Sequence, residues 1–393
     1  MYITVLLSAK IIFQFRKGIS MRVLMTGGGT GGHVNPAIAI ADYIRRMEPD
    51  SEIAFVGTSR GIENKLVPNA GYPLHHVEIQ GLKRSLSLSN LKTAWLTVTS
   101  VGKAKKLIKA FKPDIVVGTG GYVSWPVVKA ASQMGIPTAL HESNAIPGMA
   151  VKMLEGSVDK LFVNFEESKR YLKYPEKAMR TGNPLKGDFK TLSREEAHKV
   201  LGLEGKYRSL ILSYGGSMGA ERVNDEVLAL MRDFTAKNPD IRHVHAAGAI
   251  EFEAATAKFR EYGLDACPNI ELREYIYDMP LMMAAADLVI CRAGAMTLSE
   301  LAMQRKPCIL IPSPNVTNNH QYKNAHVLEE KGAASLIEEK NLGEGALMKE
   351  VSRLIRDRSA LAGMSEKIAV FSIENAGEII YNELKNLVKA DKM

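Results

Sequence analysis

The 393-residue chain has little cysteine. It contains only Cys267, Cys291 and Cys308, and no two of them have the C-x-x-C spacing of a metal or redox motif. We therefore expect neither a disulfide framework nor a structural zinc site, and a reducing cytoplasm fits the sequence best. The composition is 46% hydrophobic and 24% charged, which is typical of a globular protein and excludes a disordered one.

Long apolar runs are also missing. No segment reaches the roughly 18 to 20 apolar residues that a membrane-spanning helix needs. The first twenty residues are apolar, but Lys10 interrupts them and further charges follow, whereas a secretory signal places its charges first. We expect residues 1–20 to be a dispensable extension and not an export signal, with a membrane anchor as the open alternative and Met21 as the working start.

Acidic residues are absent from Leu82 to Lys112, in a chain with a net charge of +8. Two interpretations stay open for this basic stretch: a solvated helix face, or a docking surface for an anionic membrane. Apolar residues such as Trp95 are interleaved with its first part. The eight basic residues are Lys83, Arg84, Lys92, Lys103, Lys105, Lys106, Lys109 and Lys112.

Apolar β-rich runs alternate with amphipathic helical stretches from Met21 onward, which predicts an α/β fold with parallel sheets. The length of the chain favours two domains. Six strands are expected in each: 22–25, 53–56, 74–79, 115–117, 138–140 and 160–163, then 209–213, 243–246, 269–272, 288–291, 308–311 and 335–337.

Gly and Pro interrupt the alternation at residues 180–189, "RTGNPLKGDF", which predicts a domain boundary. We expect a first Rossmann-like domain at residues 21–182 and a second at residues 183–372. A final helical pattern at residues 373–393 is expected to pack back on the first domain.

A glycine-rich turn follows the first expected strand. Gly27, Gly29 and Gly32 satisfy G-x-G-x-x-G, and Pro36 suits the first turn of the helix that follows. Such a turn binds anions through free backbone N–H groups. However, the second strand ends in "FVGTSRG", without the acid that holds an adenosine ribose. The turn therefore predicts a phosphate site and argues against a dinucleotide.

Two further glycine turns have the same strand–turn–helix context. "GTGGYVSWP", residues 118–126, lies in the first domain, so two loops are expected to bind phosphates at one sheet edge, although tight turns alone would explain the glycines. "LILSYGGSMGA", residues 210–220, opens the second domain. There Glu300, two helical turns beyond Gly294, supplies the missing ribose acid, which places the nucleotide in the second domain.

Two residues are candidates for general base. His33 follows the first glycine turn, where the positive end of a helix favours a neutral imidazole. Glu142 leaves a strand in "LHESNAIPG", at the sheet edge where ligands of α/β proteins bind. A structural role for His33 is an equally open alternative. The chain has no D-x-D motif and no His/Cys cluster with ligand spacing, so neither metal nor cofactor is expected.

Together these motifs resemble one family, the bacterial enzymes that transfer N-acetylglucosamine (GlcNAc) from UDP-GlcNAc to undecaprenyl-diphospho-muramoyl-pentapeptide. The matching stretches, in order, are "GGTGGHVNPAIAIA", "GGYVSWP", "HESNAIPG", "GNP", "GGSMGA", "CRAGAMTLSE" and "HQYKNA". The resemblance implies a GT-B fold, in which two Rossmann-like domains with parallel sheets face a central cleft.

The resemblance also implies roles for individual residues. Catalysis would fall to His33 and Glu142. The acceptor diphosphate would meet Gly28, Gly29, Gly120, Gly121 and Tyr122. UDP-GlcNAc would be bound by Thr30, Gly31, Gly32, Asn144, Lys186, Ser217, Ile276, Ala295, Met296, Thr297, Leu298, Ser299, Glu300 and Gln321. Two positions depart from the family pattern: Lys186 replaces an arginine and loses its bidentate fork, and His320 replaces a glutamine.

The predicted function is metal-independent, inverting transfer of GlcNAc to the muramoyl C4 hydroxyl in peptidoglycan synthesis. The expected location is the cytoplasmic face of the cell membrane, with its anionic surface and other cell-wall synthesis proteins as partners and no nucleic acid. The alternatives are a dinucleotide oxidoreductase, a glycolipid synthase acting on diacylglycerol, and a non-catalytic nucleotide-binding module.

Overall fold

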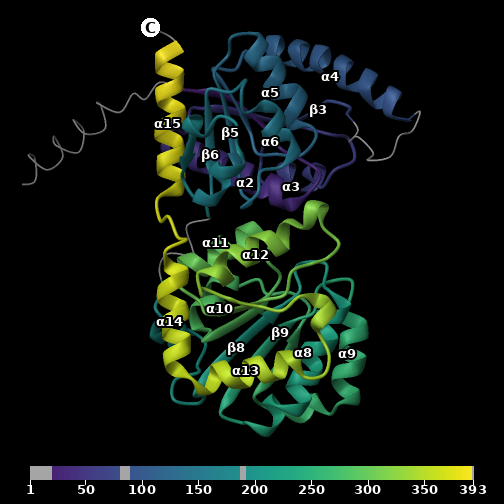
Figure 1. Cartoon of the computed structure of the whole chain (residues 1–393), viewed down its shortest axis with the longest axis vertical. Coiled ribbons are helices and arrows are strands. Elements are labelled where there is room, and N and C mark those ends of the chain that lie inside the picture. The colour runs from purple at the N-terminus through teal and green to yellow at the C-terminus, as the bar shows by residue number, and fades with distance from the viewer. Residues whose placement is uncertain (1–19, 80–88, 186–191, 392–393) are drawn as a thin grey trace, which may run out of the picture. The chain divides into compact units, whose positions relative to one another are not determined.

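The computed structural model describes residues 20–79, 89–185 and 192–391, with the backbone alone described for 89–98 (Figure 1). These residues divide into two compact units. The first contains the described chain up to His141, Met149–Leu161 and the chain from Gly377 onward. The second contains Glu142–Gly148 and Phe162–Ala376.

The N-terminal sheet has seven strands in the order β3-β2-β1-β4-β5-β6-β7. The pairings from β3 through β5 are parallel. All six strands expected here are present, and the short β7 is an addition that its three half-buried residues did not reveal. The strands are β1 (Arg22–Thr26), β2 (Glu52–Gly57), β3 (Leu74–His76), β4 (Ile115–Gly118), β5 (Thr138–Glu142), β6 (Lys160–Val163) and β7 (Ala178–Arg180).

The helices that accompany these strands follow the expected alternation, which confirms the α/β class. They are α2 (Gly31–Met47), α3 (Glu63–Asn69), α4 (Ser89–Phe111), α5 (Ser124–Gln133) and α6 (Met149–Leu154). The last helix of the chain, α15 (Ala376–Asp391), lies along the first unit (Figure 1). Its Tyr381 hydroxyl donates to Glu48 Oε1 at 2.6 Å, and Lys385 pairs with the same oxygen at 3.1 Å.

The C-terminal sheet has the order β10-β9-β8-β11-β12-β13, and all its pairings are parallel. All six expected strands are present. They are β8 (Ser209–Tyr214), β9 (Ile241–Ala246), β10 (Ile270–Arg273), β11 (Leu288–Cys291), β12 (Cys308–Leu310) and β13 (Ser335–Leu336).

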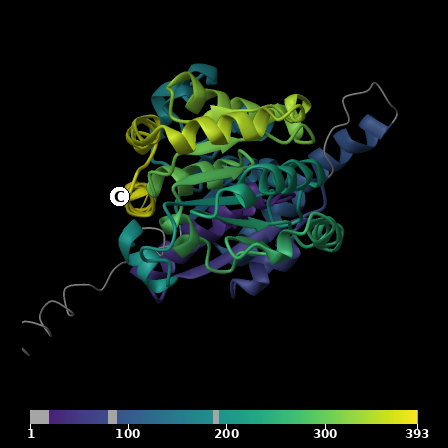
Figure 2. The same ribbon diagram turned by 90° about the horizontal axis from the view of Figure 1, so that it is seen from below.

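Helices cover both faces of this second sheet (Figure 2), and each face has its own apolar core. Along β8, Leu210 and Leu212 pack into one core while Ile211 packs into the other, as the two-residue period of a strand requires. The helices are α7 (Arg194–Val200), α8 (Glu221–Asp233), α9 (Phe252–Glu261), α10 (Met279–Ala285), α11 (Ala295–Met303), α12 (His320–Glu330), α13 (Ala346–Arg356) and α14 (Arg358–Ala369).

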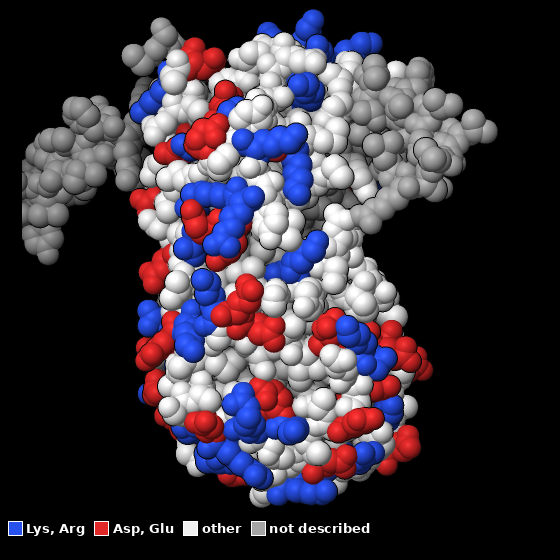
Figure 3. Space-filling model, viewed as in Figure 1, with Lys and Arg blue, Asp and Glu red and all other residues white. Residues whose placement is uncertain are grey.

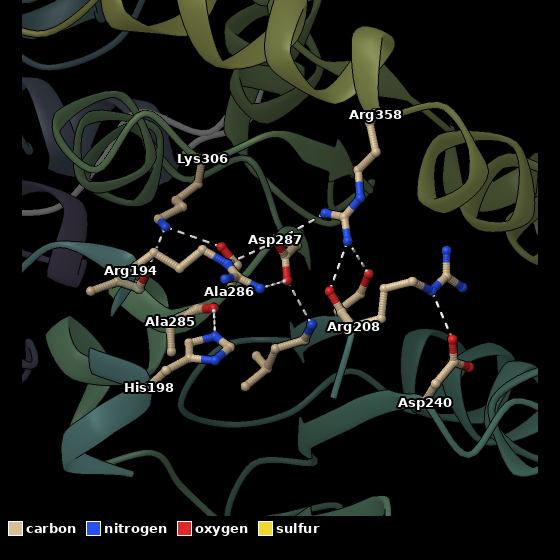
Figure 4. A network of polar contacts seen from close by, with 12 residues as sticks. Arg194, His198, Arg208, Asp240, Ala285, Ala286, Asp287, Lys306 and Arg358 are labelled. Atoms are coloured by element: carbon tan, nitrogen blue, oxygen red, sulfur yellow. Dashed lines mark hydrogen bonds and ion pairs between the residues drawn. The ribbon is translucent and has the colours of Figure 1, made fainter. Parts of the chain in front are cut away.

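An ion-pair network closes the amino-terminal edge of the second sheet (Figure 4). Asp287, just before β11, accepts hydrogen bonds from Arg194 Nε at 2.9 Å and Nη2 at 3.0 Å, and from the Leu210 N–H at 2.8 Å. Arg358 at the start of α14 also contacts this carboxylate. This network binds α7 and α14 to the amino-terminal edge of the sheet. Ligands of α/β proteins bind at the opposite edge, where the strands have their carboxyl ends.

Candidate functional site

A cleft of about 630 Å³ lies at the carboxyl ends of the strands of the second unit. The glycine turn after β8 forms one wall, residues 215–222, and the start of α11 forms another through Gly294 and Thr297. Neither α8 nor α11 has a side-chain cap at its N-terminus. Two helix ends with free N–H groups therefore border the same cleft, which suits a diphosphate.

The glycine turn after β8 depends on its glycines for shape. Gly216 and Gly219 have φ values of +102° and +92°. A Cβ at Gly219 would lie 2.4 Å from the Ala247 carbonyl oxygen, so the turn and the end of β9 approach too closely for any side chain. Ser217 is exposed at the tip of the turn and lines the cleft. Its expected contact with UDP stays a prediction.

Glu300 lies on α11, beside Tyr214 and Cys291. Burial raises the pKa of its carboxyl to about 7, because a charged carboxylate loses hydration there. A carboxylate that lacks strong partners in the free protein is suited to accept hydrogen bonds from ligand hydroxyls. The ribose role expected for Glu300 stays a prediction, since the residue lies on α11 behind the cleft residues Gly294 and Thr297.

Arg292 lines the cleft and was not predicted as a site residue, although it lies within the motif "CRAGAMTLSE". It forms an ion pair with Glu339 at 2.6 Å and donates to the carbonyl oxygens of Ile311 and Pro312 at 3.2 Å each. Both charged side chains line the cleft. Glu339 and the two carbonyl oxygens thus hold the guanidinium in place at the wall, with its charge balanced by Glu339, and only the fold brings β11 and the segment near Glu339 together.

The motifs "HESNAIPG" and "HQYKNA" meet inside the second unit. Asn324, which the sequence reading gave no role, is fully buried, accepts from the Ala145 N–H at 2.9 Å and donates to Asn144 Oδ1 at 3.1 Å. Gln321 lines the cleft and accepts from the Ser313 N–H at 2.9 Å. His320 begins α12, and its Nδ1 lies 2.9 Å from the Thr317 carbonyl oxygen.

Glu142 uses both carboxylate oxygens within its own loop. Oε1 accepts from the Asn144 N–H at 2.9 Å and from its side-chain amide at 3.0 Å, and Oε2 accepts from the Gly148 N–H at 2.7 Å. Only about 5% of the residue is exposed. Glu142 therefore shapes the 142–148 loop, which makes it the weaker of the two candidate bases.

The two glycine loops of the first unit are in contact, because β1 and β4 are neighbours in the sheet. The Gly28 N–H points to the Gly120 carbonyl oxygen at 3.4 Å. Gly121, with φ +82°, packs so closely that a Cβ there would lie 2.3 Å from the Gly28 carbonyl oxygen. Tyr122 is 58% exposed beside them. The two glycine loops therefore form one continuous surface of backbone groups.

His33 lies between these two loops, in the first turn of α2. Its Nδ1 is 3.1 Å from the Gly28 carbonyl oxygen and 3.2 Å from Thr30 Oγ1. A carbonyl only accepts hydrogen bonds, so Nδ1 carries the proton in a neutral ring and Nε2 keeps its lone pair. Nε2 faces Gly120, where a Cβ would lie 3.0 Å away. The imidazole is held in the tautomer that a general base at Nε2 requires.

Several predicted site residues do not reach an open surface. Ile276 and Leu298 are each 2% exposed and pack into the core. Ser299 is bonded to Asn183 of the "GNP" motif, whose amide donates to Ser299 Oγ at 2.9 Å and to the Ala295 carbonyl oxygen at 3.2 Å. Ala295, Met296 and Thr297 are half-exposed at the start of α11. Lys186 lies outside the described residues.

The basic stretch is described in part, since residues 82–88 and the side chains of 89–98 lie outside the description. Lys103, Lys106 and Lys109 are exposed on α4, Lys112 follows it, and Lys105 is half-buried. On the face shown in Figure 3, by contrast, the second unit mixes acidic and basic side chains.

None of the described helices has the length and the apolar composition that crossing a bilayer requires. Nor do three His, Cys, Asp or Glu side chains of the described residues form a group able to bind a metal.

Comparisons with known proteins agree with the fold. The chain matches two family models, the glycosyltransferase family 28 N-terminal domain over residues 23–163 and its C-terminal domain over residues 210–379. Its fold matches that of the calicheamicin glycosyltransferase CalG4 with a TM-score of 0.65, over 94% of this chain and 99% of that one, at 14% identity. Fold and cleft together define a GT-B glycosyltransferase with two doubly wound parallel sheets.

Closer relatives narrow this class. An Acetivibrio thermocellus enzyme named UDP-N-acetylglucosamine–N-acetylmuramyl-(pentapeptide) pyrophosphoryl-undecaprenol N-acetylglucosamine transferase is 43% identical over 94% of this chain and 99% of its own length. The crystal structure of Acinetobacter baumannii MurG is 26% identical, with a TM-score of 0.76, over 93% of this chain and 99% of that one. The chain belongs to this family of UDP-GlcNAc-dependent N-acetylglucosaminyltransferases.

Proposed function

We propose that the protein transfers GlcNAc from UDP-GlcNAc to the C4 hydroxyl of the muramoyl sugar in undecaprenyl-diphospho-MurNAc-pentapeptide, in peptidoglycan synthesis. The supporting observation is the cleft of the second unit, where two uncapped helix N-termini, Arg292 and Gln321 surround a space of about 630 Å³. The helix ends and the guanidinium suit the diphosphate, Glu300 the ribose, and Gln321 the sugar.

The reaction is a single displacement. The C4 oxygen of the acceptor forms a bond to the anomeric carbon of GlcNAc while the bond from that carbon to the UDP oxygen breaks, so the configuration inverts. The hydroxyl proton passes to Nε2 of His33, and the electron pair of the broken bond leaves with UDP. Helix N-termini and Arg292 stabilise the charge that develops on the diphosphate, so the step needs no metal ion.

The first unit supplies the acceptor side. Gly31 and Gly32 begin α2, and no hydrogen bond in the described chain uses their N–H groups. With the adjoining surface of Gly28, Gly120 and Tyr122, they form the place where the acceptor diphosphate and the reacting hydroxyl would meet His33. The lysines of α4 provide a surface for the anionic cytoplasmic face of the membrane, where the lipid-linked acceptor resides.

One assay tests the proposal. The protein is given UDP-GlcNAc and the lipid-linked muramoyl-pentapeptide, with and without EDTA, and the disaccharide product and released UDP are measured. We expect both products in equal amounts and no effect of EDTA. Transfer to diacylglycerol in place of the muramoyl lipid would favour a glycolipid synthase, and UDP binding without transfer to either lipid would favour a non-catalytic module.

A further inference from the structure

A buried carboxylate that belongs to no predicted site lies behind the first glycine turn. Glu63 opens α3, six residues after the end of β2, and none of its surface is exposed. Its Oε2 accepts from the Gly29 N–H at 2.9 Å. Its Oε1 accepts from the Thr58 N–H at 2.9 Å and from the Thr58 hydroxyl at 2.8 Å.

Glu63 is a carboxylate rather than a neutral acid. Burial raises the pKa of its carboxyl, but hydrogen bonds from the N–H groups of Gly29, Thr58 and Glu63 itself, together with the Thr58 hydroxyl, outweigh burial and lower the pKa below its ordinary value. Among the ion pairs of the described residues none involves Glu63. Its charge is therefore balanced by backbone dipoles, and the turn that supplies them is the one that carries Gly28 and Gly29.

The Gly29 N–H and the Gly28 C=O belong to the same peptide group. On one side of that planar group, the N–H donates to the Glu63 carboxylate at 2.9 Å. On the other side, the C=O accepts from Nδ1 of His33 at 3.1 Å. A peptide that donates to an anion becomes a stronger acceptor at its oxygen, because hydrogen bonds in a chain polarise one another.

We infer that Glu63 is a positioning residue for His33, acting through the Gly28–Gly29 peptide as a carboxylate–peptide–imidazole relay. The carboxylate fixes the peptide plane and strengthens the Gly28 carbonyl as acceptor. This carbonyl holds the proton of His33 on Nδ1, so the lone pair of Nε2 stays free for the acceptor hydroxyl. The catalytic consequence rests on the proposed function of His33; the effect on the tautomer does not.

The geometry defines a sharp substitution. Two backbone N–H groups point at two different oxygens of Glu63, Gly29 at Oε2 and Thr58 at Oε1. A glutamine has a single side-chain oxygen, so in either orientation of a Glu63→Gln side chain one N–H faces an NH₂ group. This change removes the charge and disturbs the peptide with almost no change of volume.

Glu48→Gln is the matched control. Glu48 is also buried in the first unit, at the opposite end of α2 from His33. It accepts from the Ser51 hydroxyl at 3.1 Å and the Tyr381 hydroxyl at 2.6 Å, and unlike Glu63 it also forms an ion pair, with Lys385 at 3.1 Å. Both variants remove the charge of a buried glutamate and should lower the melting temperature. Only Glu63→Gln should act on His33.

Three readouts separate positioning from stability. We expect Glu63→Gln to lower kcat about 10- to 100-fold while the KM for UDP-GlcNAc stays within about twofold. In long-range ¹H–¹⁵N spectra, native His33 should carry its proton on Nδ1, and the Nε2-protonated form should increase in Glu63→Gln. Glu48→Gln should show neither effect.

The inference is overturned if native His33 is protonated on Nε2, a measurement that needs no variant to fold. It is also overturned if Glu63→Gln leaves the tautomer unchanged, or if its kcat is no lower than that of Glu48→Gln. Failure of the proposed function looks different: the native protein would then transfer no GlcNAc. Failure of the role of His33 alone would leave the turnover of His33→Ala unchanged. In both cases the spectra of native protein and of Glu63→Gln would still report on the relay.

Discussion

The two units each begin their sheet with a strand, a glycine turn and a helix, yet the two turns differ in what occupies them. In the first unit, the carboxylate of Glu63 takes the Gly29 N–H, and His33 lies on the other side of the same peptide. In the second unit, the turn at residues 215–220 borders an open cleft, and no carboxylate of the described chain bonds to its N–H groups. The same local pattern thus holds a buried carboxylate and a histidine in one unit and borders an open cleft in the other, which we propose to be the support of a base and an anion site, respectively.

The comparison also revises one reading of the sequence. The end of β2 lacks an acid in "FVGTSRG", but Glu63 follows two residues later and its carboxylate folds back to the turn. The first unit therefore does have an acid near the place where dinucleotide-binding proteins hold the ribose. Because the carboxylate is buried and fully bonded to the protein, it offers nothing to a ribose, and the argument against a dinucleotide still stands.

The largest effect is expected from the base. His33→Ala removes the group that we propose as the general base, so turnover should fall about 10²- to 10⁴-fold. The affinity for UDP-GlcNAc, measured by calorimetry, should stay nearly intact because the cleft belongs to the second unit. Unchanged turnover would remove His33 from the mechanism and leave the first turn with a structural role only.

The next prediction compares the lysines of α4 in the first unit with exposed lysines of the second unit. Reversing the charge of Lys103, Lys105 and Lys106 should weaken binding to anionic vesicles about 100-fold or more in a sedimentation assay, since each lysine near such a surface contributes about 1 kcal/mol. The same reversal at Lys199, Lys206 and Lys237, exposed in the second unit, is the control and should have little effect. Binding that survives the α4 reversal and high salt would show that α4 is not the docking surface.

A smaller loss is expected at the ribose acid. Glu300→Gln should weaken UDP binding about 10-fold, because a neutral amide accepts hydrogen bonds from hydroxyls less strongly than a carboxylate. The loss should shrink for 2′-deoxy-UDP, which lacks one of the hydroxyls. If UDP and its deoxy form lose the same affinity, Glu300 does not contact the 2′-hydroxyl.

The smallest effect is a pH dependence of UDP binding. The folded pKa of Glu300 is raised to about 7, so the carboxyl of the free protein gains its proton as the pH falls through that value. If the ribose hydroxyls bind the carboxylate, affinity should fall a few-fold from about pH 8 to about pH 6, since part of the binding energy is spent on deprotonation. Calorimetry across this range with UDP-GlcNAc, whose diphosphate has no terminal phosphate that titrates there, should show the slope in the native protein and none in Glu300→Gln.

The same raised pKa has a consequence for stability. The ordinary pKa of a glutamate is near 4.5, so the folded protein binds a proton at Glu300 that the unfolded chain releases between that value and about 7. The contribution of Glu300 to folding is therefore favourable at low pH and becomes unfavourable as the pH rises through this window. A bound ribose would offset this cost, which links nucleotide binding to the ionisation of Glu300.

Local patterns in the sequence determined a large part of this protein. All twelve expected strands are present, because buried parallel strands are apolar runs bounded by turn residues, which is a property of neighbours in the chain. The three-residue β7 was missed, since its half-buried residues carry no such signal. The glycine turns were found because a strand, a turn with positive φ and a helix follow one another directly. The order of the motifs along the chain was sufficient to identify the family.

Only the tertiary structure decided which groups remain free for chemistry. No local pattern indicated that Glu63 would accept from the Gly29 N–H, that Glu142 would use both oxygens within its own loop, or that Asn324 would join two distant motifs. A hydrogen-bonding group can act on a ligand only if the fold has not already satisfied it, and its partners can come from distant segments, such as Asn324 and Asn144, which are 180 residues apart. The alternation of strand and helix patterns in the sequence therefore predicted where the loops lie, while long-range contacts determine which groups of each loop are free to bind a ligand.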